Sequence, residues 1–209
     1  MLKAGLTGGI ATGKSSALAT FVRLGAVGID ADRLGHRVIE KGRPAYLEAV
    51  REFGSRMILA ADGEIDRKKL GAIVFADEAK LKRLNAIVHP RVFEEPQLET
   101  DAALAARSHP IVMVDASLMI ETGSYRRYDK IVVVFCAPEI QLSRLMARDH
   151  LTSEEAIQRI SRQLPSEEKL KYAHYRIETS GTLEDTRRQV REVYGRLLGD
   201  YEEMQGDPG

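Results

Sequence analysis

The sequence predicts an α/β fold with a mainly parallel sheet of about five strands, covered by helices on both faces. Short apolar runs alternate with longer amphipathic segments along the chain, which is the order of repeated β-α-β units. The runs 111–114 and 131–136 are apolar without alternation. Such runs are typical of parallel strands that are buried on both sides. The chain has 209 residues, enough for one such domain with a small insertion.

The elements follow one another from a strand at 2–7 that ends in glycines. Further strands are expected at 26–29, 111–114, 131–136 and 175–177. Helices are expected over 14–24, from Asp30-Ala31-Asp32 to about 40, and over 45–53, 66–75, 77–88, 90–107, 138–148, 153–163 and 182–204, with a turn at 61–64.

Several helix starts carry a local signal. Pro44 and Pro138 suit the first turn of a helix, where the absent N–H is not needed. Asp66 is a plausible N-cap. Thr152 or Ser153, followed by Glu155 or Glu154, has the arrangement of a capping box.

The stretch 42–107 contains helical patterns and no convincing strand. We therefore expect a single domain whose core comprises about 1–41 and 108–209, interrupted by a helical insertion at about 42–107. In such a domain the carboxyl edge of the sheet carries the ligand site.

Composition excludes several classes of protein. Hydrophobic residues make up 44% and charged residues 30% of the chain, so disorder and a collagen-like fold are excluded. The 31 basic and 31 acidic residues balance, which argues against a nucleic-acid or polybasic membrane partner. The one cysteine, Cys136, cannot form an intrachain disulfide and is expected to be a buried strand residue. Without a membrane-length apolar run or a signal-peptide pattern, we expect a cytoplasmic protein.

A glycine-rich loop follows the first strand. The segment 8–15, Gly-Gly-Ile-Ala-Thr-Gly-Lys-Ser, fits the pattern G-x-x-x-x-G-K-[ST]. Glycines let successive N–H groups point at phosphate oxygens, and the next helix offers its positive end to the same anion. In this pattern Lys14 reaches the β- and γ-phosphates, while the Ser15 hydroxyl is a ligand for Mg²⁺. The sequence therefore predicts a P-loop NTPase fold. The residues expected to bind ATP are Gly9, Ala11, Thr12, Gly13, Lys14, Ser15 and Ser16.

The rest of the sequence indicates which class of nucleotide-binding protein this is. The guanine-reading Asn-Lys-x-Asp of switch GTPases does not occur in the sequence. A short chain with the loop at its start and a helical insertion favours a small-molecule kinase, in which the insertion binds the acceptor and a basic lid closes over ATP.

Two carboxylates follow the second strand, at the edge where the acceptor is expected. Asp32 is the candidate that accepts the proton of the attacking hydroxyl and orients it toward the γ-phosphate. Asp30 is expected to have a structural role. The alternative is that one of the two only caps the next helix.

Further segments support a resemblance that extends over nearly the whole chain. They are Leu6-Thr7-Gly8-Gly9-Ile10, Ile29-Asp30-Ala31-Asp32, the runs 66–70 and 73–75, Leu84-Asn85-Ala86-Ile87-Val88-His89-Pro90, Leu118-Met119-Ile120-Glu121, 141–149 and Arg159-Ile160-Ser161-Arg162-Gln163. In this order they resemble the dephospho-coenzyme A kinases. The resemblance implies transfer of the ATP γ-phosphate to the ribose 3′-hydroxyl of dephospho-CoA, with Mg²⁺, giving CoA and ADP in the last step of CoA biosynthesis.

The resemblance also implies roles for single residues. It makes Asp32 the base at the 3′-hydroxyl, and it gives His89 a place in the substrate site, although a structural role is an equal alternative. Arg67 can meet an anionic part of the acceptor, or lie at the surface. Arg144 and Arg148 share one helix face in a lid at about 144–165. Arg148 is the better candidate for neutralising charge on the transferred group, and Arg144 is more readily explained as a solvated arginine.

The sequence departs from the family pattern in three places. The loop has Ile10-Ala11-Thr12-Gly13 where the family is richer in glycine and serine, Ser117 stands in place of a proline, and Thr179-Ser180-Gly181 replaces Asn-x-Gly. None removes a group that the chemistry needs. Two alternative functions stay open: a kinase of another small metabolite such as a nucleoside monophosphate, and a nucleotide-binding module without catalysis. The oligomeric state is not predicted.

Overall fold

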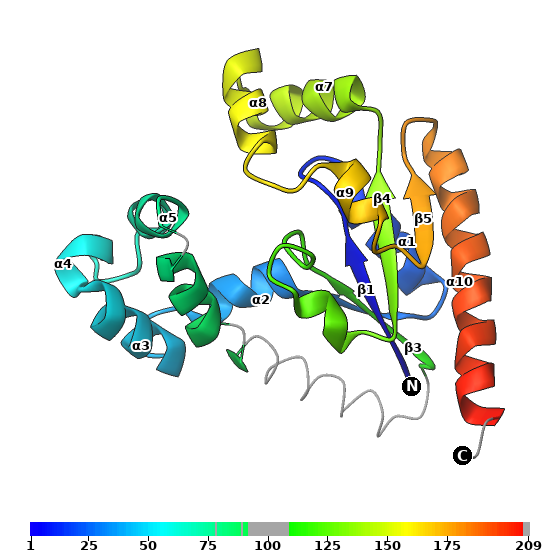
Figure 1. Ribbon diagram of the computed structural model, residues 1–209, viewed down its shortest axis with the longest axis horizontal. Helices are drawn as coiled ribbons and strands as arrows, with labels where there is room; N and C mark the ends of the chain where they lie inside the picture. Colours follow the sequence, from blue (N-terminus) through cyan, green and yellow to red (C-terminus); the bar gives the residue numbers. More distant parts are fainter. Residues whose placement is uncertain (78, 89, 92–108, 207–209) are drawn as a thin grey trace. The chain divides into compact units, whose positions relative to one another are not determined.

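The computed structural model describes residues 1–77, 79–88, 90–91 and 109–206 (Figure 1). The chain divides into two compact units. The first unit comprises Met1–Asp30 and Ala102–Gly209, and the second comprises Ala31–Asp101.

The first unit contains a sheet of five parallel strands in the order β2-β3-β1-β4-β5. The strands are β1 (Leu2–Thr7), β2 (Val27–Asp30), β3 (Ile111–Asp115), β4 (Lys130–Phe135) and β5 (Tyr175–Glu178). The predicted parallel sheet is thereby confirmed. Because all strands run the same way, the ends of β1, β2 and β3 meet at one edge, where Leu6 and Asp30 both lie opposite Asp115.

Both faces of the sheet are buried, as the unalternating apolar runs predicted. Val132 and Val134 of β4 belong to the larger core cluster, which also holds side chains of α1 (Lys14–Arg23) and α10 (Leu183–Gly206). Ile131 and Val133 of the same strand belong to a second cluster, which α9 (Ser166–Leu170) joins through Leu170. Figure 1 shows α10 running beside β5.

Two helices follow β4 and form most of the predicted lid. They are α7 (Pro138–Asp149) and α8 (Ser153–Ile160). Pro138 lies in the first turn of α7, as predicted. Of the alternatives for the capping box, Thr152 with Glu155 is the correct one: Glu155 N donates to Thr152 Oγ1 at 3.3 Å, and Thr152 N donates to Glu155 Oε2 at 2.9 Å.

The second unit is helical over its described residues. It contains α2 (Ala31–Val38), α3 (Pro44–Phe53), α4 (Ser55–Ile58), α5 (Arg67–Phe75) and helical residues 79–88. Asp66 is the N-cap of α5 and accepts hydrogen bonds from the N–H groups of Lys68 and Lys69, as predicted. Leu59 and Ile65 form an isolated antiparallel bridge around the predicted turn.

Several elements differ from the sequence prediction. Helix α8 ends at Ile160, so residues 161–163 form a turn instead of helix. The helices α4 and α9 and the 3₁₀ helix η1 (Ser124–Arg127) were not predicted. They contain only four or five residues, and helices so short depend on tertiary packing. Residues 92–107 of the predicted helix 90–107 lie outside the described residues. Among those described, no helix has the length and apolar character needed to cross a bilayer.

Candidate active site

The glycine-rich loop connects β1 to α1, and two of its glycines are required by geometry. At Gly8 a Cβ atom would lie 2.1 Å from the carbonyl oxygen of Val134, so a side chain cannot be accommodated. Gly13 has φ 92° and caps α1, a left-handed conformation that glycine adopts without strain. The loop therefore packs directly against β4 and turns sharply into α1.

Ala11 adopts the same left-handed region without being glycine, with φ 59°. For an alanine this conformation costs about 1–2 kcal/mol. The next residue, Thr12, is fully buried and its Oγ1 donates to Gly9 O at 2.8 Å. The tight turn at the middle of the loop is thus held by the loop's own hydrogen bonds as well as by contacts described below.

The N-terminus of α1 is built for an anion. Gly13 supplies no side-chain cap, and the first turn of α1 contains no acidic residue. Instead the helix begins with Lys14 and the exposed Ser15, so a cation stands at the end where the helix dipole is positive. This charge is unfavourable to the helix by itself and becomes favourable when an anion binds there, as at the phosphate sites of other helix N-termini.

Side chains from the far end of the chain support the loop. Gln141 Nε2 donates to Ile10 O at 2.8 Å, and Gln163 Oε1 accepts from Ile10 N at 2.7 Å. Thr179, which is buried, donates through Oγ1 to Thr12 O at 2.7 Å. Sequence analysis assigned a role to none of the three.

Arg144 is not the solvated arginine that its sequence suggested. Its Nη2 donates to Thr179 O at 2.7 Å and its Nη1 to Thr179 Oγ1 at 3.1 Å. The guanidinium therefore braces the residue that supports Thr12. The nearby Cys136 is buried as predicted, and this burial raises the pKa of its thiol.

Arg148, the predicted lid arginine, is exposed at the end of α7 and is engaged by its neighbour. Its Nε and Nη2 donate to the two carboxylate oxygens of Asp149 at 2.8 and 3.1 Å. Arg159 of α8 donates to the same carboxylate at 2.8 Å. The hydrogen bond from Arg148 lowers the pKa of Asp149. Asp149 therefore ties the two lid helices together through two cations.

Asp115 is a further candidate that sequence analysis missed. It is the last residue of β3 and is only 7% exposed, and the N–H of the following Ala116 donates to Leu6 O at 3.0 Å. A carboxylate thus borders the strand that leads into the loop, as the Walker-B aspartate does in P-loop NTPases. The apolar run 111–114 followed by an aspartate was the available signal.

The structure describes two of the three residues predicted to serve the acceptor, and both belong to the second unit. Asp32 is exposed in the first turn of α2, directly after β2 ends at Asp30. Arg67 is exposed at the start of α5 and lines an open pocket of about 730 Å³ in the second unit, with Lys41, Glu64 and Lys68 among its other residues. His89 lies outside the described residues.

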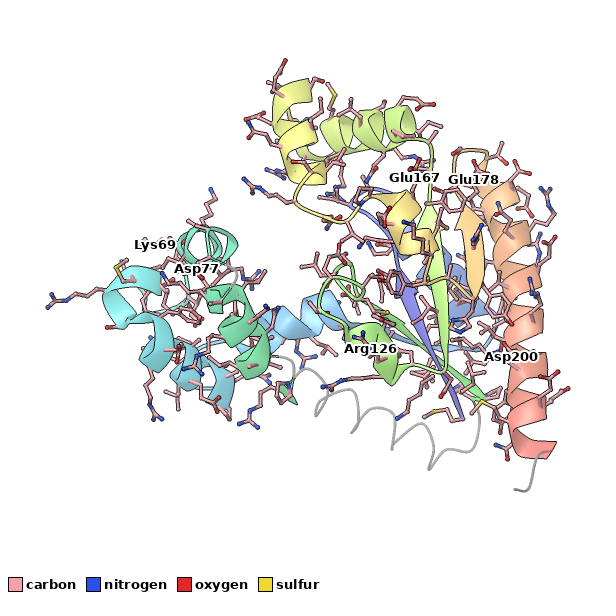
Figure 2. All side chains as sticks on the ribbon, in the orientation of Figure 1. Lys69, Asp77, Arg126, Glu167, Glu178 and Asp200 are labelled. Carbon is pink, nitrogen blue, oxygen red and sulfur yellow. The ribbon has the colours of Figure 1, made fainter. Side chains whose placement is uncertain are left out.

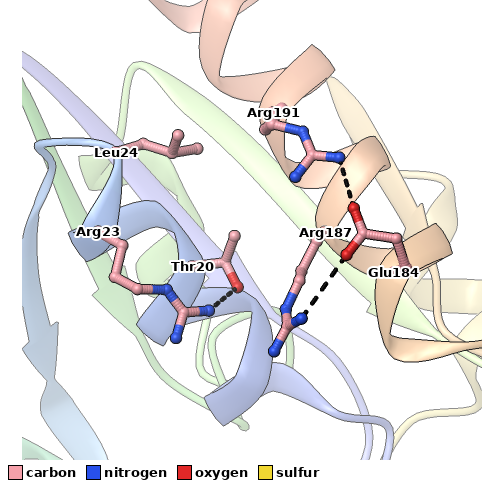
Figure 3. Close-up of a pocket in the computed structure, with 6 residues that line it drawn as sticks. All are labelled: Thr20, Arg23, Leu24, Glu184, Arg187 and Arg191. Atoms are coloured by element: carbon pink, nitrogen blue, oxygen red, sulfur yellow. Dashed lines mark hydrogen bonds and ion pairs between the residues drawn. The ribbon is translucent and has the colours of Figure 1, made fainter.

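A second pocket, of about 380 Å³, lies between the C-terminal end of α1 and the start of α10 (Figure 3). Its arginines are engaged locally: Arg187 and Arg191 pair with Glu184, and Arg23 donates to Thr20 Oγ1. It contains none of the loop residues. We therefore do not assign it to the reaction.

The oxygen ligands around the loop suit Mg²⁺. The Ser15 hydroxyl and the Asp115 carboxylate are hard oxygen donors, and Mg²⁺ is commonly bound by one or two such groups plus substrate phosphates. Among the described residues, no cluster of three or more His, Cys, Asp or Glu side chains is arranged to hold a metal.

Comparison with known proteins agrees with this site. The family model described as dephospho-CoA kinase matches residues 2–185. The chain is 46% identical over 189 residues to the dephospho-CoA kinase of Geobacillus kaustophilus, covering 90% of this chain and 93% of the relative. It is 42% identical over 200 residues to that of Aquifex aeolicus, covering 96% and 100%.

Solved structures give the same result. A Thermus thermophilus structure matches with a TM-score of 0.78 and 32% identity, covering 94% of this chain and 97% of that one. A dephospho-CoA kinase from Campylobacter jejuni matches with a TM-score of 0.63 and 28% identity, covering 93% and 96%. The predicted P-loop kinase fold and the predicted dephospho-CoA kinase activity are thereby confirmed. The chain has a phosphate loop on a parallel sheet, and it matches dephospho-CoA kinases in sequence and in structure over nearly its whole length. The chain therefore belongs to the dephospho-CoA kinase family.

Proposed function

We propose that this protein transfers the γ-phosphoryl group of ATP to the ribose 3′-hydroxyl of dephospho-CoA, and that the loop between β1 and α1 binds the ATP phosphates. One observation carries the ATP site: α1 begins with Lys14, after an uncapped glycine and without an acidic residue in its first turn. A bound anion would offset the unfavourable charge at that helix start. The acceptor follows from the family to which the chain belongs.

The loop residues divide the work of holding the phosphates. Backbone N–H groups of the loop from Gly9 to Ser16 line the phosphate site, apart from those of Ile10, Thr12 and Ser16, which donate to Gln163 Oε1, Gly9 O and Gly13 O. Ala11, Thr12 and Gly13 shape the turn. Lys14 neutralises charge on the β- and γ-phosphates. The chemistry that Mg²⁺ would supply here is to offset the negative charge of the phosphates. Ser15 would hold it directly, and the buried Asp115 would orient its water ligands.

Asp32 is proposed as the general base. Its carboxylate accepts the proton of the ribose 3′-hydroxyl as that oxygen forms a bond to the γ-phosphorus. The bond from the γ-phosphorus to the bridging oxygen breaks, and ADP leaves with the electron pair. Asp30, which ends β2 opposite Asp115, has the structural part in this scheme.

Three further residues complete the proposal. Arg148 neutralises charge on the transferred group once the lid closes, and in the structure its guanidinium donates both of its hydrogen bonds to Asp149. Arg67 and His89 bind anionic and polar parts of dephospho-CoA.

A coupled assay of ADP release tests the proposal. Protein, ATP and Mg²⁺ are mixed with dephospho-CoA, or with adenosine, AMP or shikimate in parallel. We expect rapid ADP release with dephospho-CoA alone among these acceptors, and a product carrying one added phosphate at the 3′ position. Faster turnover with AMP would point to a nucleoside monophosphate kinase. Nucleotide binding without turnover on any acceptor would contradict the catalytic assignment.

A further inference from the structure

The N–H and the C=O of Ile10 each form a hydrogen bond with a glutamine side chain near one end of the lid. Gln163 Oε1 accepts from Ile10 N at 2.7 Å, and Gln141 Nε2 donates to Ile10 O at 2.8 Å. Gln141 precedes the lid segment 144–165 on α7, and Gln163 lies near its end. From this geometry we infer that Gln163 is a positioning residue for the phosphate loop, acting through the N–H of Ile10 together with Gln141.

Gln163 is itself anchored by the next residue. Leu164 N donates to Glu121 Oε1 at 2.9 Å. Glu121 also receives a hydrogen bond from Lys169 Nζ at 2.9 Å, and the same ammonium donates to Ser117 O at 2.6 Å. Because the Lys169 side chain is fully buried, this ion pair fixes the end of the lid to the turn after β3. The Gln163 side chain therefore extends to the loop from a rigid base.

The loop has a specific need for this support. Ala11, the residue after Ile10, holds a left-handed conformation that alanine disfavours. A loop that leaves this conformation loses the arrangement of N–H groups on which phosphate binding depends, and its apparent affinity falls with the populated fraction. The two hydrogen bonds to Ile10 oppose that departure.

This inference rests on the proposed ATP site at the same loop. A positioning role and a purely structural role for Gln163 predict different measurements. A structural role predicts lower stability with unchanged nucleotide affinity in the folded protein. Positioning predicts weaker nucleotide binding, with binding of the other substrate unchanged.

Three variants separate the hydrogen bond from packing. Gln163→Met keeps the length of the side chain without its oxygen, and Gln163→Glu keeps an acceptor. Gln158→Met is the matched control, because Gln158 is an exposed glutamine on α8 of the same lid. Hydrogen exchange at the Ile10 amide is measured by NMR without ligand. The dissociation constant of ADP and the KM values of ATP and dephospho-CoA are measured as well.

In Gln163→Met we expect Ile10 exchange to accelerate by about fivefold or more, the equivalent of one lost hydrogen bond. The ADP dissociation constant and the KM for ATP should rise by a similar factor, with the KM for dephospho-CoA unchanged. Gln163→Glu should keep the slow exchange, and Gln158→Met should match the wild type in every measurement.

Unchanged Ile10 exchange in Gln163→Met, or faster exchange with wild-type ADP affinity, would overturn the inference. Failure of the ATP site itself gives a different result. In that case the wild-type protein binds no ADP at all, whatever its Ile10 amide shows.

Discussion

At the scale of single residues, Lys14 occupies a position that serves ligand binding at the expense of the helix. A cation in the first turn of α1 opposes the helix dipole, and the turn has no acidic residue to compensate. A residue kept for folding would have the opposite charge. The effects of Lys14 on stability and on catalysis should therefore separate.

Replacing Lys14 with alanine should abolish most of the activity without harming the fold. We expect a loss in kcat of about 10²-fold or more, because a preorganised charge on the transferred phosphate is removed. Stability should stay equal or rise by about 0.3–1 kcal/mol, since the unfavourable cation is gone and alanine favours the helix. Steady-state kinetics and a urea titration measure the two quantities. A variant with near-normal kcat would show that Lys14 has been misassigned.

The two aspartates near the end of β2 should respond very differently to the same substitution. Asp32→Asn keeps the size of the side chain but cannot take up a proton, so kcat should fall by about 10²–10⁴-fold, with little change in ATP affinity. Because phosphoryl transfer depends largely on positioning, the loss should lie toward the lower value. Asp30→Asn should be much milder.

Single-turnover transfer to dephospho-CoA and nucleotide titration compare these variants. Equal, small losses in both would contradict the assignment of Asp32 as the base. A large loss of Mg·ATP affinity in Asp32→Asn would place its carboxylate among the groups that hold the metal's water ligands.

At the level of the secondary-structure elements, α9 contributes a buried lysine, Lys169, to an ion pair with Glu121. The Lys169 side chain is fully buried, and its Nζ lies 2.7 Å from Glu121 Oε1. Removing one partner of a buried ion pair leaves the other charge buried without compensation. The resulting loss of stability is larger than the net stabilisation that the pair contributes. Helix α9 should therefore depend on Lys169 more than on the exposed Lys171 that follows the helix.

Lys169→Met should lower the free energy of unfolding by about 3 kcal/mol or more. Lys171→Met on the neighbouring turn is the control: Lys171 pairs with Glu168 at 2.7 Å in an exposed position, where ion pairs contribute little. Urea unfolding of both variants measures the difference. Equal effects would mean that burial of the Lys169–Glu121 pair does not matter to stability.

Helix α10 is attached to the sheet through Asp200 (Figure 2), which makes its attachment sensitive to acid. Its carboxylate accepts from Lys130 Nζ at 2.7 Å and from the Tyr175 hydroxyl. Burial alone would raise the pKa of Asp200, but the two hydrogen bonds outweigh it and the pKa is lowered. The pKa of Tyr175 is raised to about 12, so its hydroxyl keeps its proton over the acid range.

A carboxylate with a lowered pKa stabilises the folded state above its unfolded pKa of about 3.9, and the contribution disappears as the pH falls through the folded value. Stability should therefore decline below about pH 4, and less steeply in Asp200→Asn than in the wild type. Urea midpoints measured between about pH 2.5 and 7, on both sides of the aspartate pKa, give the slope of stability against pH for the wild type and for Asp200→Asn. Parallel slopes would show that Asp200 does not contribute to the acid transition.

At the scale of the whole molecule, transfer requires that water be kept from the γ-phosphate, because hydrolysis otherwise competes. We expect residues 148–163 of the lid and the helical stretch 42–107 to exchange amide hydrogens more slowly when both substrates are bound. Mass-spectrometric hydrogen exchange, with ADP and dephospho-CoA together and separately, tests this. Unchanged exchange in both segments on forming the ternary complex would count against closure.

The parts of this protein that depend on local chemistry could be predicted from its residues. The strands and their burial on both faces followed from unalternating apolar runs. The caps at Asp66 and Thr152 followed from a side chain and its neighbours two or three residues away. The pattern of the phosphate loop was predictable for the same reason: its glycines, Lys14 and Ser15 all lie within the eight residues 8–15.

The contacts that hold this loop in place could not be predicted, because they come from distant parts of the chain. Gln163 lies 153 residues from Ile10, and Thr179 lies 167 residues from Thr12. Hydrogen bonds over such separations have no local pattern, since they depend on how β4, β5 and the lid assemble around the loop. Arg144 illustrates the consequence. The local sequence of a helix arginine is the same whether its side chain lies in solvent or donates to Thr179, as it does here. Asp115 gained its place beside the loop in the same way, because the pairing of β3 with β1 brings their ends together.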